Sequence, residues 1–492
     1  MLFSVVADIS KRGDGALLAL PFWEKPKAAA PLGKKLEALV KLPIVAKDFL
    51  GKEEESVLLY SGEEKEGRVL LFGLGKEEKV SVEVLRKAFA QVAKQCQKRK
   101  IQKINVLLPS VAELRKMTLE ESLRGACEGI LSVNYAWDEK SIEGDKKTLL
   151  TSVSLIGVLP KTLPIIKCFE DVAEAVYFSR DLINGNADIV TPQYLVAAAK
   201  GLSLKFPTIE TTIFDKKQLE KEKMGLLLAV GRGAIHDPAF IIASYKGHPR
   251  AKDHTVLIGK GITFDTGGLN LKPTGSMETM RADMSGAAAV LGAIAAVAAL
   301  QLKVNVTAVV ATAENAIDAQ SIKPGDVYRS YSGKTVEIGN TDAEGRLILA
   351  DAISYTVKNL SPSRMIDLAT LTGAVSIALG DDVAGVLSND DKLVDKLLSS
   401  GEKTAELLWR LPLHPAYKEQ LKSDIADLKN IGAGRAGGTI LGGLFLEEFV
   451  DKIPWAHLDI GGTAFASKER EYLPKRGIGF GVRLLVDFLS TP

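Results

Sequence analysis

Apolar and polar positions alternate along this chain in short blocks that predict strands and helices in turn. In the first third, strand-like apolar runs are SVLLYSG, RVLLFGLG and KINVLLP. Helical spacing of apolar residues instead characterises SVEVLRKAFAQVAKQCQKRK. The pattern predicts a small α/β domain in this part of the chain.

The remainder of the chain repeats this alternation on a larger scale. Short apolar runs, each followed by a glycine-bearing loop or a polar turn and usually a helix, are TVLIG, VNVTAVVATAEN, TVEIG and RMIDLAT. Such alternation predicts an α/β fold with a mainly parallel or mixed sheet flanked by helices, whose ligands bind beyond the carboxyl ends of the strands.

The patterning weakens between residues 143 and 167, where a charged stretch is followed by Pro160 and Pro164. We therefore predict an N-terminal α/β domain over residues 1–165 and a larger domain over residues 166–492. Within the larger domain, the alanine-rich run Gly286–Leu300 is shorter than the roughly 20 residues that span a bilayer. It predicts a buried helix, and we expect no membrane association.

Composition narrows the classes of partner. The chain has 492 residues with 63 basic and 61 acidic side chains, a net charge of +2, so no global field attracts nucleic acid or anionic lipid. Its three cysteines form no close pair, which predicts neither a disulfide framework nor a thiolate metal site. The first residues of the sequence include an acid, Asp8, and their basic residues follow the apolar run, which is the reverse of a secretory signal. We expect a cytoplasmic protein.

The chemically informative residues follow the predicted strands. They are Lys260, Asp265, Lys272, Asp283, Asp342, Glu344 and Arg346. The last three stand at alternate positions of NTDAEGR and would point the same way from an extended segment. Any one of these acids could be a helix cap or a solvated charge, but together they form a constellation.

Four carboxylates at one end of a sheet repel one another unless cations neutralise them. Carboxylate oxygens suit magnesium, manganese or zinc, and a pair of ions about 3.5 to 4 Å apart can clamp a shared water and a polarised carbonyl. A lysine among the ligands must be held deprotonated by the metal, whereas a lysine that stays charged would polarise a substrate carbonyl.

Other classes of site have less support. The sequence contains neither H-E-x-x-H nor G-x-S-x-G, and His457, in the apolar WAHLDI, is expected to be a core histidine. The basic KQCQKRKIQK fits a cationic last helical turn as well as a nucleic-acid patch, and we expect no nucleic acid. Two alternatives stay open, a binding protein with a vestigial enzyme site and a two-metal phosphohydrolase.

Four motifs point to one family. NTDAEGRLILADA resembles the signature of the leucyl aminopeptidases, the cytosol aminopeptidase family, and GKGITFDTGGLNLKP, MRADMSGAA and DLATLTGA are similar to its other motifs in the same order. The resemblance covers roughly Arg180 to Leu489. It implies a metallopeptidase that releases the N-terminal residue, leucine or another mainly apolar residue, from peptides. It also implies a homohexamer, with the N-terminal domain in an assembly or regulatory role.

The resemblance also implies a role for each motif residue. A tighter metal would be bound by Lys260, Asp265, Asp283 and Glu344. A more exchangeable metal would be bound by Asp265, Asp342 and Glu344. The ions would be Mn²⁺ or Zn²⁺. Lys272 would polarise the scissile carbonyl, and Arg346 would hold a bicarbonate ion as the general base. An apolar pocket for the first side chain would be lined by Met280, Thr370 and Ala464.

The chain departs from the family pattern at four positions away from these metal ligands. Ser285 stands where glycine is more usual, and Ala234 stands where serine is usual. Ile478 and Phe480 lie in RGIGFGVRLL, where a GATGRPV-like stretch is expected. These departures affect the expected shape of the pocket more than the expected reaction.

Overall fold

The computed structural model describes residues 2–62, 65–110, 114, 117–137 and 147–491. It forms two compact units, Met1–Ala173 with Lys468–Pro474, and Glu174–Ser467 with Lys475–Pro492. The division falls inside α4 (Leu163–Asn184), and the predicted boundary at residue 165 lies near the start of this helix. Residues 143–146 of the weakly patterned stretch lie outside the described ranges.

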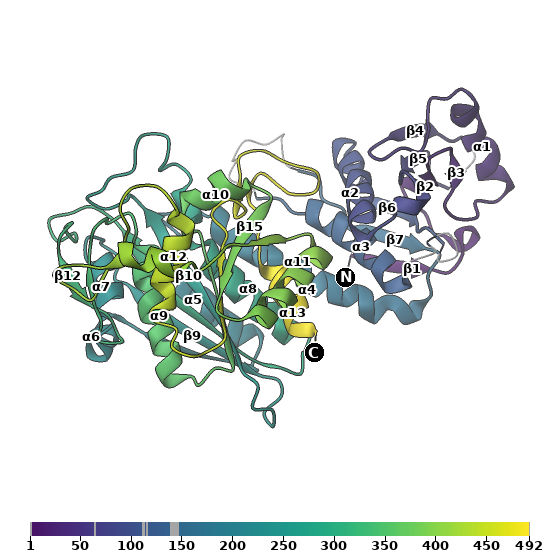
Figure 1. Ribbon diagram of the computed structural model, residues 1–492. Coiled ribbons are helices and arrows are strands. Elements are labelled where there is room, and N and C mark those ends of the chain that lie inside the picture. The colour runs from purple at the N-terminus through teal and green to yellow at the C-terminus, as the bar shows by residue number, and fades with distance from the viewer. Residues whose placement is uncertain (1, 63–64, 111–113, 115–116, 138–146, 492) are drawn as a thin grey trace. The chain divides into compact units, whose positions relative to one another are not determined.

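The N-terminal unit is built on one sheet with the strand order β1-β7-β6-β2-β5-β4, in which β3 pairs with β2 (Figure 1). All pairs along this order are parallel except β4 with β5. The strands are β1 (Phe3–Val6), β2 (Leu17–Trp23), β3 (Lys27–Ala28), β4 (Ser56–Tyr60), β5 (Arg68–Gly73), β6 (Lys103–Leu107) and β7 (Ser152–Ile156). The helices before α4 are α1 (Lys34–Val45), α2 (Val82–Lys98) and α3 (Leu119–Val133).

Local sequence sets the ends of the two long helices in this unit. The Ser81 hydroxyl accepts from Val84 N at the start of α2, and Thr118 with Glu121 forms a reciprocal capping box at the start of α3. Both helices bury an apolar face in the same core cluster as the strands. The α/β domain that the sequence predicts here is confirmed.

The second unit, which we call the catalytic unit because it carries the candidate residues, has an eight-stranded sheet of order β16-β15-β18-β14-β10-β11-β9-β8. The pairs β16-β15, β18-β14, β14-β10 and β10-β11 are parallel and the others are antiparallel. The strands are β8 (Ile209–Phe214), β9 (Ala239–Lys246), β10 (Thr255–Asp265), β11 (Asn305–Asn315), β14 (Arg364–Ala369), β15 (Val383–Ser388), β16 (Leu407–Arg410) and β18 (Trp455–Asp459). This is the mixed sheet flanked by helices that the sequence predicts.

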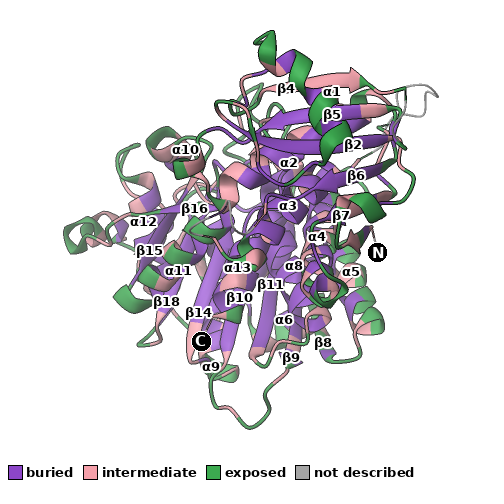
Figure 2. Cartoon of the chain, turned by 90° about the vertical axis from the view of Figure 1, so that its right-hand side faces the viewer, coloured by how far each residue is buried: buried purple, intermediate pink, exposed green. Residues whose placement is uncertain are grey.

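Helices cover this sheet, and Figure 2 shows its strands largely buried. They are α5 (Pro192–Lys205), α6 (Lys216–Glu222), α7 (Gly225–Gly231), α8 (Ser285–Ala299), α9 (Gly345–Asn359), α10 (Gly373–Leu379), α11 (Asp391–Thr404), α12 (Gly438–Glu447) and α13 (Val482–Ser490). A two-stranded ribbon joins β19 (Phe465–Ala466) to β20 (Arg476–Gly477).

One predicted strand lies elsewhere. TVEIG forms β13 (Thr335–Glu337), which pairs with β12 (Val327–Arg329) and β17 (Leu428–Lys429) in a separate three-stranded sheet. The expectation that this run belongs to the large sheet was wrong. With only Val336 fully buried, β13 lacks the long apolar run of a strand covered on both faces.

The alanine-rich run forms α8, and the prediction of a buried helix is confirmed. The stretch Met280–Ala299 is long and apolar enough to cross a membrane, and nearly all of it is buried inside the unit. Close packing explains the small residues, because a Cβ on Gly286 would lie 2.0 Å from Leu368 O. The buried hydroxyl of Ser285 is satisfied because it donates to Ala282 O at 2.5 Å.

Two buried acids hold parts of the sheet and its helices together. Asp367 accepts from Trp455 Nε1 at 2.7 Å and lies 2.6 Å from His457 Nδ1. His457 is therefore a core histidine paired through Nδ1, while its Nε2 has no hydrogen-bond partner within the described residues. Asp351, on α9, accepts from the backbone N–H groups of Leu226 and Leu227 at the start of α7, and from Tyr331 N.

We predict that Asp351→Ala lowers the free energy of unfolding by about 3 kcal/mol, because it leaves three N–H groups without their acceptor. As a matched control, Asp390→Ala removes a single cap from Leu393 N at the start of α11 and should cost about 1 kcal/mol. Urea-induced unfolding measures both. Equal effects of the two substitutions would contradict the role given to Asp351.

This stabilisation should depend on pH. Burial raises the pKa of Asp351 to about 7 against the effect of its three hydrogen bonds, so the folded protein holds the proton more tightly than the unfolded chain. Proton binding by Asp351 therefore adds to the free energy of unfolding below the unfolded pKa of about 4, and this addition is lost as the pH rises toward 7. The deficit of Asp351→Ala should therefore shrink over this interval.

Candidate metal centre

The structure brings the seven candidate residues together around the carboxyl end of β10 and the start of α9. Lys260 lies within β10 and Asp265 ends it, beyond a break in register with β11 between Ile262 and Asp265. Such irregularities re-aim a side chain at the end of a strand. Asp283 comes from the 3-10 turn Met280–Met284 that leads into α8.

Lys260 is the hub of one half of the site. Its Nζ lies 2.8 Å from Asp283 Oδ1 and 2.8 Å from Glu344 Oε1, and it donates to Thr370 O at 2.9 Å. The Lys260 side chain is 3% exposed. A Cβ on Gly345 would lie 2.5 Å from Lys260 Cε, so glycine at the start of α9 gives the lysine its space.

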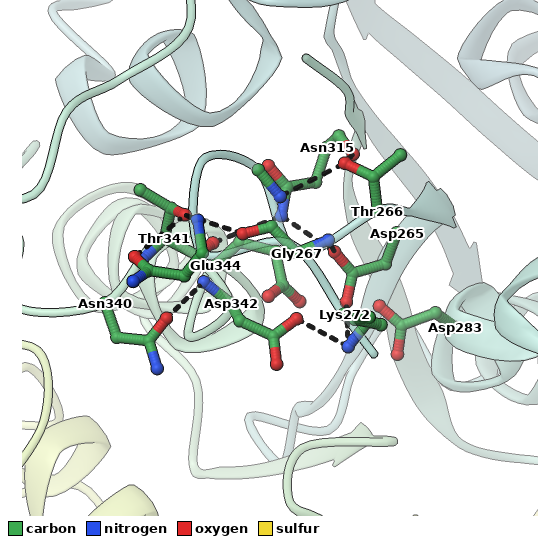
Figure 3. Close-up of polar contacts among 12 residues, drawn as sticks. Asp265, Thr266, Gly267, Lys272, Asp283, Asn315, Asn340, Thr341, Asp342 and Glu344 are labelled. Atoms are coloured by element: carbon green, nitrogen blue, oxygen red, sulfur yellow. Dashed lines mark hydrogen bonds and ion pairs between the residues drawn. The ribbon is translucent and has the colours of Figure 1, made fainter. Parts of the chain in front are cut away.

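The other half joins Asp265 to Asp342 through Lys272 (Figure 3). Lys272 Nζ lies 2.7 Å from Asp265 Oδ2 and 2.5 Å from Asp342 Oδ1. One carboxylate oxygen from each of Asp265, Asp342 and Glu344 lies within 4.8 Å of the others. Three acids from two segments distant in the sequence thus converge on a single point.

The expectation that Asp342, Glu344 and Arg346 extend from one strand-like segment was wrong. Glu344 has helical backbone angles and precedes α9, and Arg346 is the second residue of this helix. The apolar residues that follow pull the segment into a helix. The acid then lies at a helix N-terminus, where the macrodipole favours negative charge.

The acids of the site are held in an unfavourable environment for charge. Burial and the charge of Glu344 raise the pKa of Asp265 to about 6, and burial also raises the pKa values of Asp283 and Asp342. Burial would likewise raise the pKa of Glu344, but the neighbouring Lys260 ammonium lowers it. Burial by itself would lower the pKa of Lys260, but the charges of Asp283 and Glu344 raise it above its ordinary value.

This donor set fits divalent cations. Asp283 Oδ2 is buried and has no hydrogen-bond partner within the described residues, although Oδ1 of the same carboxylate accepts from Thr370 Oγ1 at 2.7 Å. Four carboxylates lie beside two ammonium groups and the Arg346 guanidinium, so the acids outnumber the cations by one. A ligand nitrogen from Lys260 requires that a metal displace its proton.

Arg346 lies beside the acids. It is 7% exposed, its Nη1 donates to Asn430 O at 2.7 Å, and its Nε has no partner within the described part of the chain. Burial lowers the pKa of Arg346 to about 10, which still leaves it charged at neutral pH. A buried cation with an unused donor suits a small anion.

The three predicted pocket residues differ in their surroundings. Thr370 contacts both Lys260 and Asp283 through its carbonyl and hydroxyl groups. Met280 is half-buried at the start of the 3-10 turn that carries Asp283. Ala464 is buried after β18, and its carbonyl accepts from Ile478 N at 3.2 Å.

Sequence reasoning missed the polar residues that hold the loops of the site. The side chains of Asn315, Thr341 and Asn270 link the loop after β10 to the loop before α9. Asn315 ends β11, which runs parallel to β10. A polar residue at the carboxyl end of a predicted parallel strand is the signal that could have found it.

Two family models match the chain. The catalytic domain of the cytosol aminopeptidase family matches residues 177–486, and the N-terminal domain of that family matches residues 20–141. The chain belongs to the cytosol aminopeptidase family. The resemblance carried by the four motifs is therefore confirmed.

Relatives support the assignment over the whole length of the aminopeptidase. A probable cytosol aminopeptidase of Protochlamydia amoebophila is 51% identical over 500 residues, covering 100% of this chain and 99% of the relative. One of Chlamydia caviae is 49% identical over 497 residues, with the same coverage.

Solved structures agree. A mutant of tomato leucine aminopeptidase has a TM-score of 0.87 at 33% identity, covering 100% of this chain and 96% of the other. The bottromycin maturation enzyme BotP in complex with Mn has a TM-score of 0.85 at 30% identity, with coverages of 97% and 99%.

The chain is thus a metal-dependent aminopeptidase, a hydrolase that removes N-terminal residues from peptides. Peptidases of this family use a pair of metal ions, and the carboxylate cluster of this chain fits such a pair. Of the alternatives open at the sequence level, the assignment favours the peptidase over the phosphohydrolase and the binding protein.

We predict that metal-stripped aminopeptidase unfolds at a lower temperature than the same protein with added Mn²⁺. A cation that binds only the folded state stabilises it by about 2.7 kcal/mol at a hundredfold excess over its dissociation constant. Scanning calorimetry measures the shift, with Glu344→Ala as the control that should respond least. An Mn²⁺-independent unfolding temperature would contradict the metal centre.

Proposed function

We propose that the aminopeptidase holds its two cations with five of the clustered residues. The tighter site consists of Lys260, Asp265, Asp283 and Glu344, and the more exchangeable site consists of Asp265, Asp342 and Glu344. The convergence of Asp265, Asp342 and Glu344 within 4.8 Å is the observation that carries this proposal. We propose Mn²⁺ or Zn²⁺ as the ions, since both accept oxygen and nitrogen ligands.

When bound, such a pair would lower the pKa of a shared water and polarise the carbonyl of the peptide bond. The chain's own residues place the substrate. Lys272 is anchored between Asp265 and Asp342 and its side chain is 14% exposed. We assign it the role of donating a hydrogen bond to the scissile carbonyl oxygen, where negative charge develops during attack.

We assign Arg346 the binding of a bicarbonate ion, which would supply a base beside the reacting water. The unused Nε and the buried, charged guanidinium support this role. The hydrogen bond from Nη1 to Asn430 O fixes the orientation of the guanidinium. Arg346 therefore stays protonated throughout and acts by holding the anion in place.

For the substrate, we propose peptides that begin with leucine or another mainly apolar residue. We assign the apolar lining of the pocket to the half-buried Met280 and the buried Ala464, and we place Thr370 in the same pocket because its hydroxyl contacts Asp283. Ile478 and Phe480, buried after β20, stand where a GATGRPV-like stretch is expected, and we propose that they alter the shape of this pocket.

We further propose a cytosolic homohexamer in which residues 1–165 serve assembly or regulation. The names and full-length similarity of the relatives support the location. Sedimentation equilibrium on the full chain tests the assembly, and a monomer at micromolar concentration would contradict it.

The proposed function is tested with metal-stripped protein and a leucine arylamide. Adding Mn²⁺ or Zn²⁺ should restore release of the arylamine, whereas the N-acetylated substrate should stay intact because its amine is blocked. Cleavage of both substrates would show that the free amine is not recognised. Release of phosphate from a generic ester without any arylamide cleavage would overturn the peptidase function.

We predict that Glu344→Ala abolishes metal binding and turnover together, because Glu344 is shared by both proposed sites. Chelator competition for Mn²⁺ and the arylamide assay measure the two effects. If Glu344→Ala retains full activity, the bridging role is wrong.

Lys272→Ala should act differently. We expect metal to remain bound while kcat falls about 10²- to 10³-fold, the loss typical of removing one donor to a developing oxyanion. The control is Lys246→Ala, an exposed lysine at the end of β9 that pairs with Glu210, which should leave kcat unchanged. A Lys272→Ala variant that loses its metal, rather than its rate, would make Lys272 a structural partner of the acids.

A further inference from the structure

The last residue of β11 contacts a proposed metal ligand without being one. Asn315 is 2% exposed and stands opposite Asp265 in the parallel register of β10 and β11. Its Nδ2 donates to Asp265 Oδ1 at 2.7 Å and to Thr341 O at 3.1 Å. One amide group therefore connects the segment that carries Asp265 to the segment that carries Asp342, as Figure 3 shows.

The two segments are tied by further bonds around this amide. Thr341 Oγ1 donates to Gly267 O at 2.6 Å and accepts from Asn270 N at 2.9 Å. Asn270 Oδ1 accepts from Thr341 N at 2.8 Å. On the other side, Thr266 N and Thr266 Oγ1 both donate to Asn315 O, at 3.0 and 2.8 Å. Asn315 thus holds the Asp265 loop through both its backbone and its side chain.

We propose that Asn315 is a positioning residue of the metal centre, which fixes the Asp265 carboxylate and, through Thr341, the backbone before Asp342. The inference rests on the proposed ligand set. Asp265 Oδ1 also accepts from Gly267 N at 2.9 Å, so two N–H groups fix its direction and set where Oδ2 points. These two bonds use both lone pairs of Oδ1, so Oδ2, which lies 2.7 Å from Lys272 Nζ, is the oxygen left for ligation.

The residue type at position 315 follows from the surrounding charges. The position needs a donor, since it faces a carboxylate oxygen and a carbonyl oxygen. An aspartate there would have the same shape but would place another acid within hydrogen-bond distance of Asp265. A neutral amide supplies the N–H groups and adds no charge. It therefore leaves the attraction between the acids and the cations unchanged.

Three variants of the full-length, metal-stripped protein test this role. Asn315→Ala removes the amide, and Asn315→Asp keeps its shape but lacks the N–H donors and, when ionised, cannot donate at all. The control is Asn305→Ala, at the opposite end of β11, where Nδ2 donates to the carbonyl oxygens of His248, Ala251 and Asp253. Mn²⁺ affinity is measured by competition with a chromophoric chelator, unfolding by calorimetry, and kcat and KM at saturating Mn²⁺.

We expect Asn315→Ala to weaken Mn²⁺ binding about 10- to 100-fold, as loss of a group that orients a ligand typically does. Asn315→Asp should lose at least as much, and Asn305→Ala should bind Mn²⁺ like the parent. Excess Mn²⁺ should restore part of the kcat of Asn315→Ala without a change in KM, which a general loss of structure would not allow.

Parent-like Mn²⁺ affinity in both Asn315 variants would overturn the inference while leaving the ligand set intact. Unfolding of both variants under conditions where Asn305→Ala stays folded would make Asn315 a structural residue, which also overturns it. If the parent protein binds no Mn²⁺ in this assay, the proposed ligand set fails and this inference fails with it.

Discussion

The catalytic unit depends on one buried ammonium group. Lys260 reaches from the middle of β10 to Asp283, Glu344 and the carbonyl of Thr370. These three partners come from the turn before α8, the start of α9 and the end of β14. A buried charge costs several kcal/mol unless it is paired, so the elements must meet around it. Gly345 provides the space in which they do.

The same contacts explain how acids that repel one another can share a small volume. Lys260 and Lys272 each pair with two carboxylates, which lets the chain fold around the site. Burial still raises the pKa values of Asp265 and Asp283, so the lysines compensate the acids only partly. Negative charge that the lysines leave uncompensated would favour the binding of divalent cations at this site.

Parts of this arrangement could be predicted from the residues alone. Acids and lysines just after apolar runs predict a site at the carboxyl ends of strands, because parallel strands end at a common edge of the sheet. Asp265, at the end of β10, is an example. The conformation around Glu344 was harder to predict, because charged residues at every second position fit the start of a helix as well as an extended strand. The role of Asn315 could not be predicted, because it depends on a hydrogen bond to Asp265 that only the folded chain forms and that no sequence motif indicates.

By itself, the sequence determined the α/β alternation, the buried alanine-rich helix, the chemical types of the site residues and, through four motifs, the family. Those features are local, since they depend on periodicity and residue type. Only the tertiary structure decided that β13 leaves the large sheet, that Glu344 precedes a helix, and that Lys260 and Lys272 each join two acids. The reason is physical: hydrogen bonds and ion pairs between residues far apart in the chain form only when the packing of the core sets their distance.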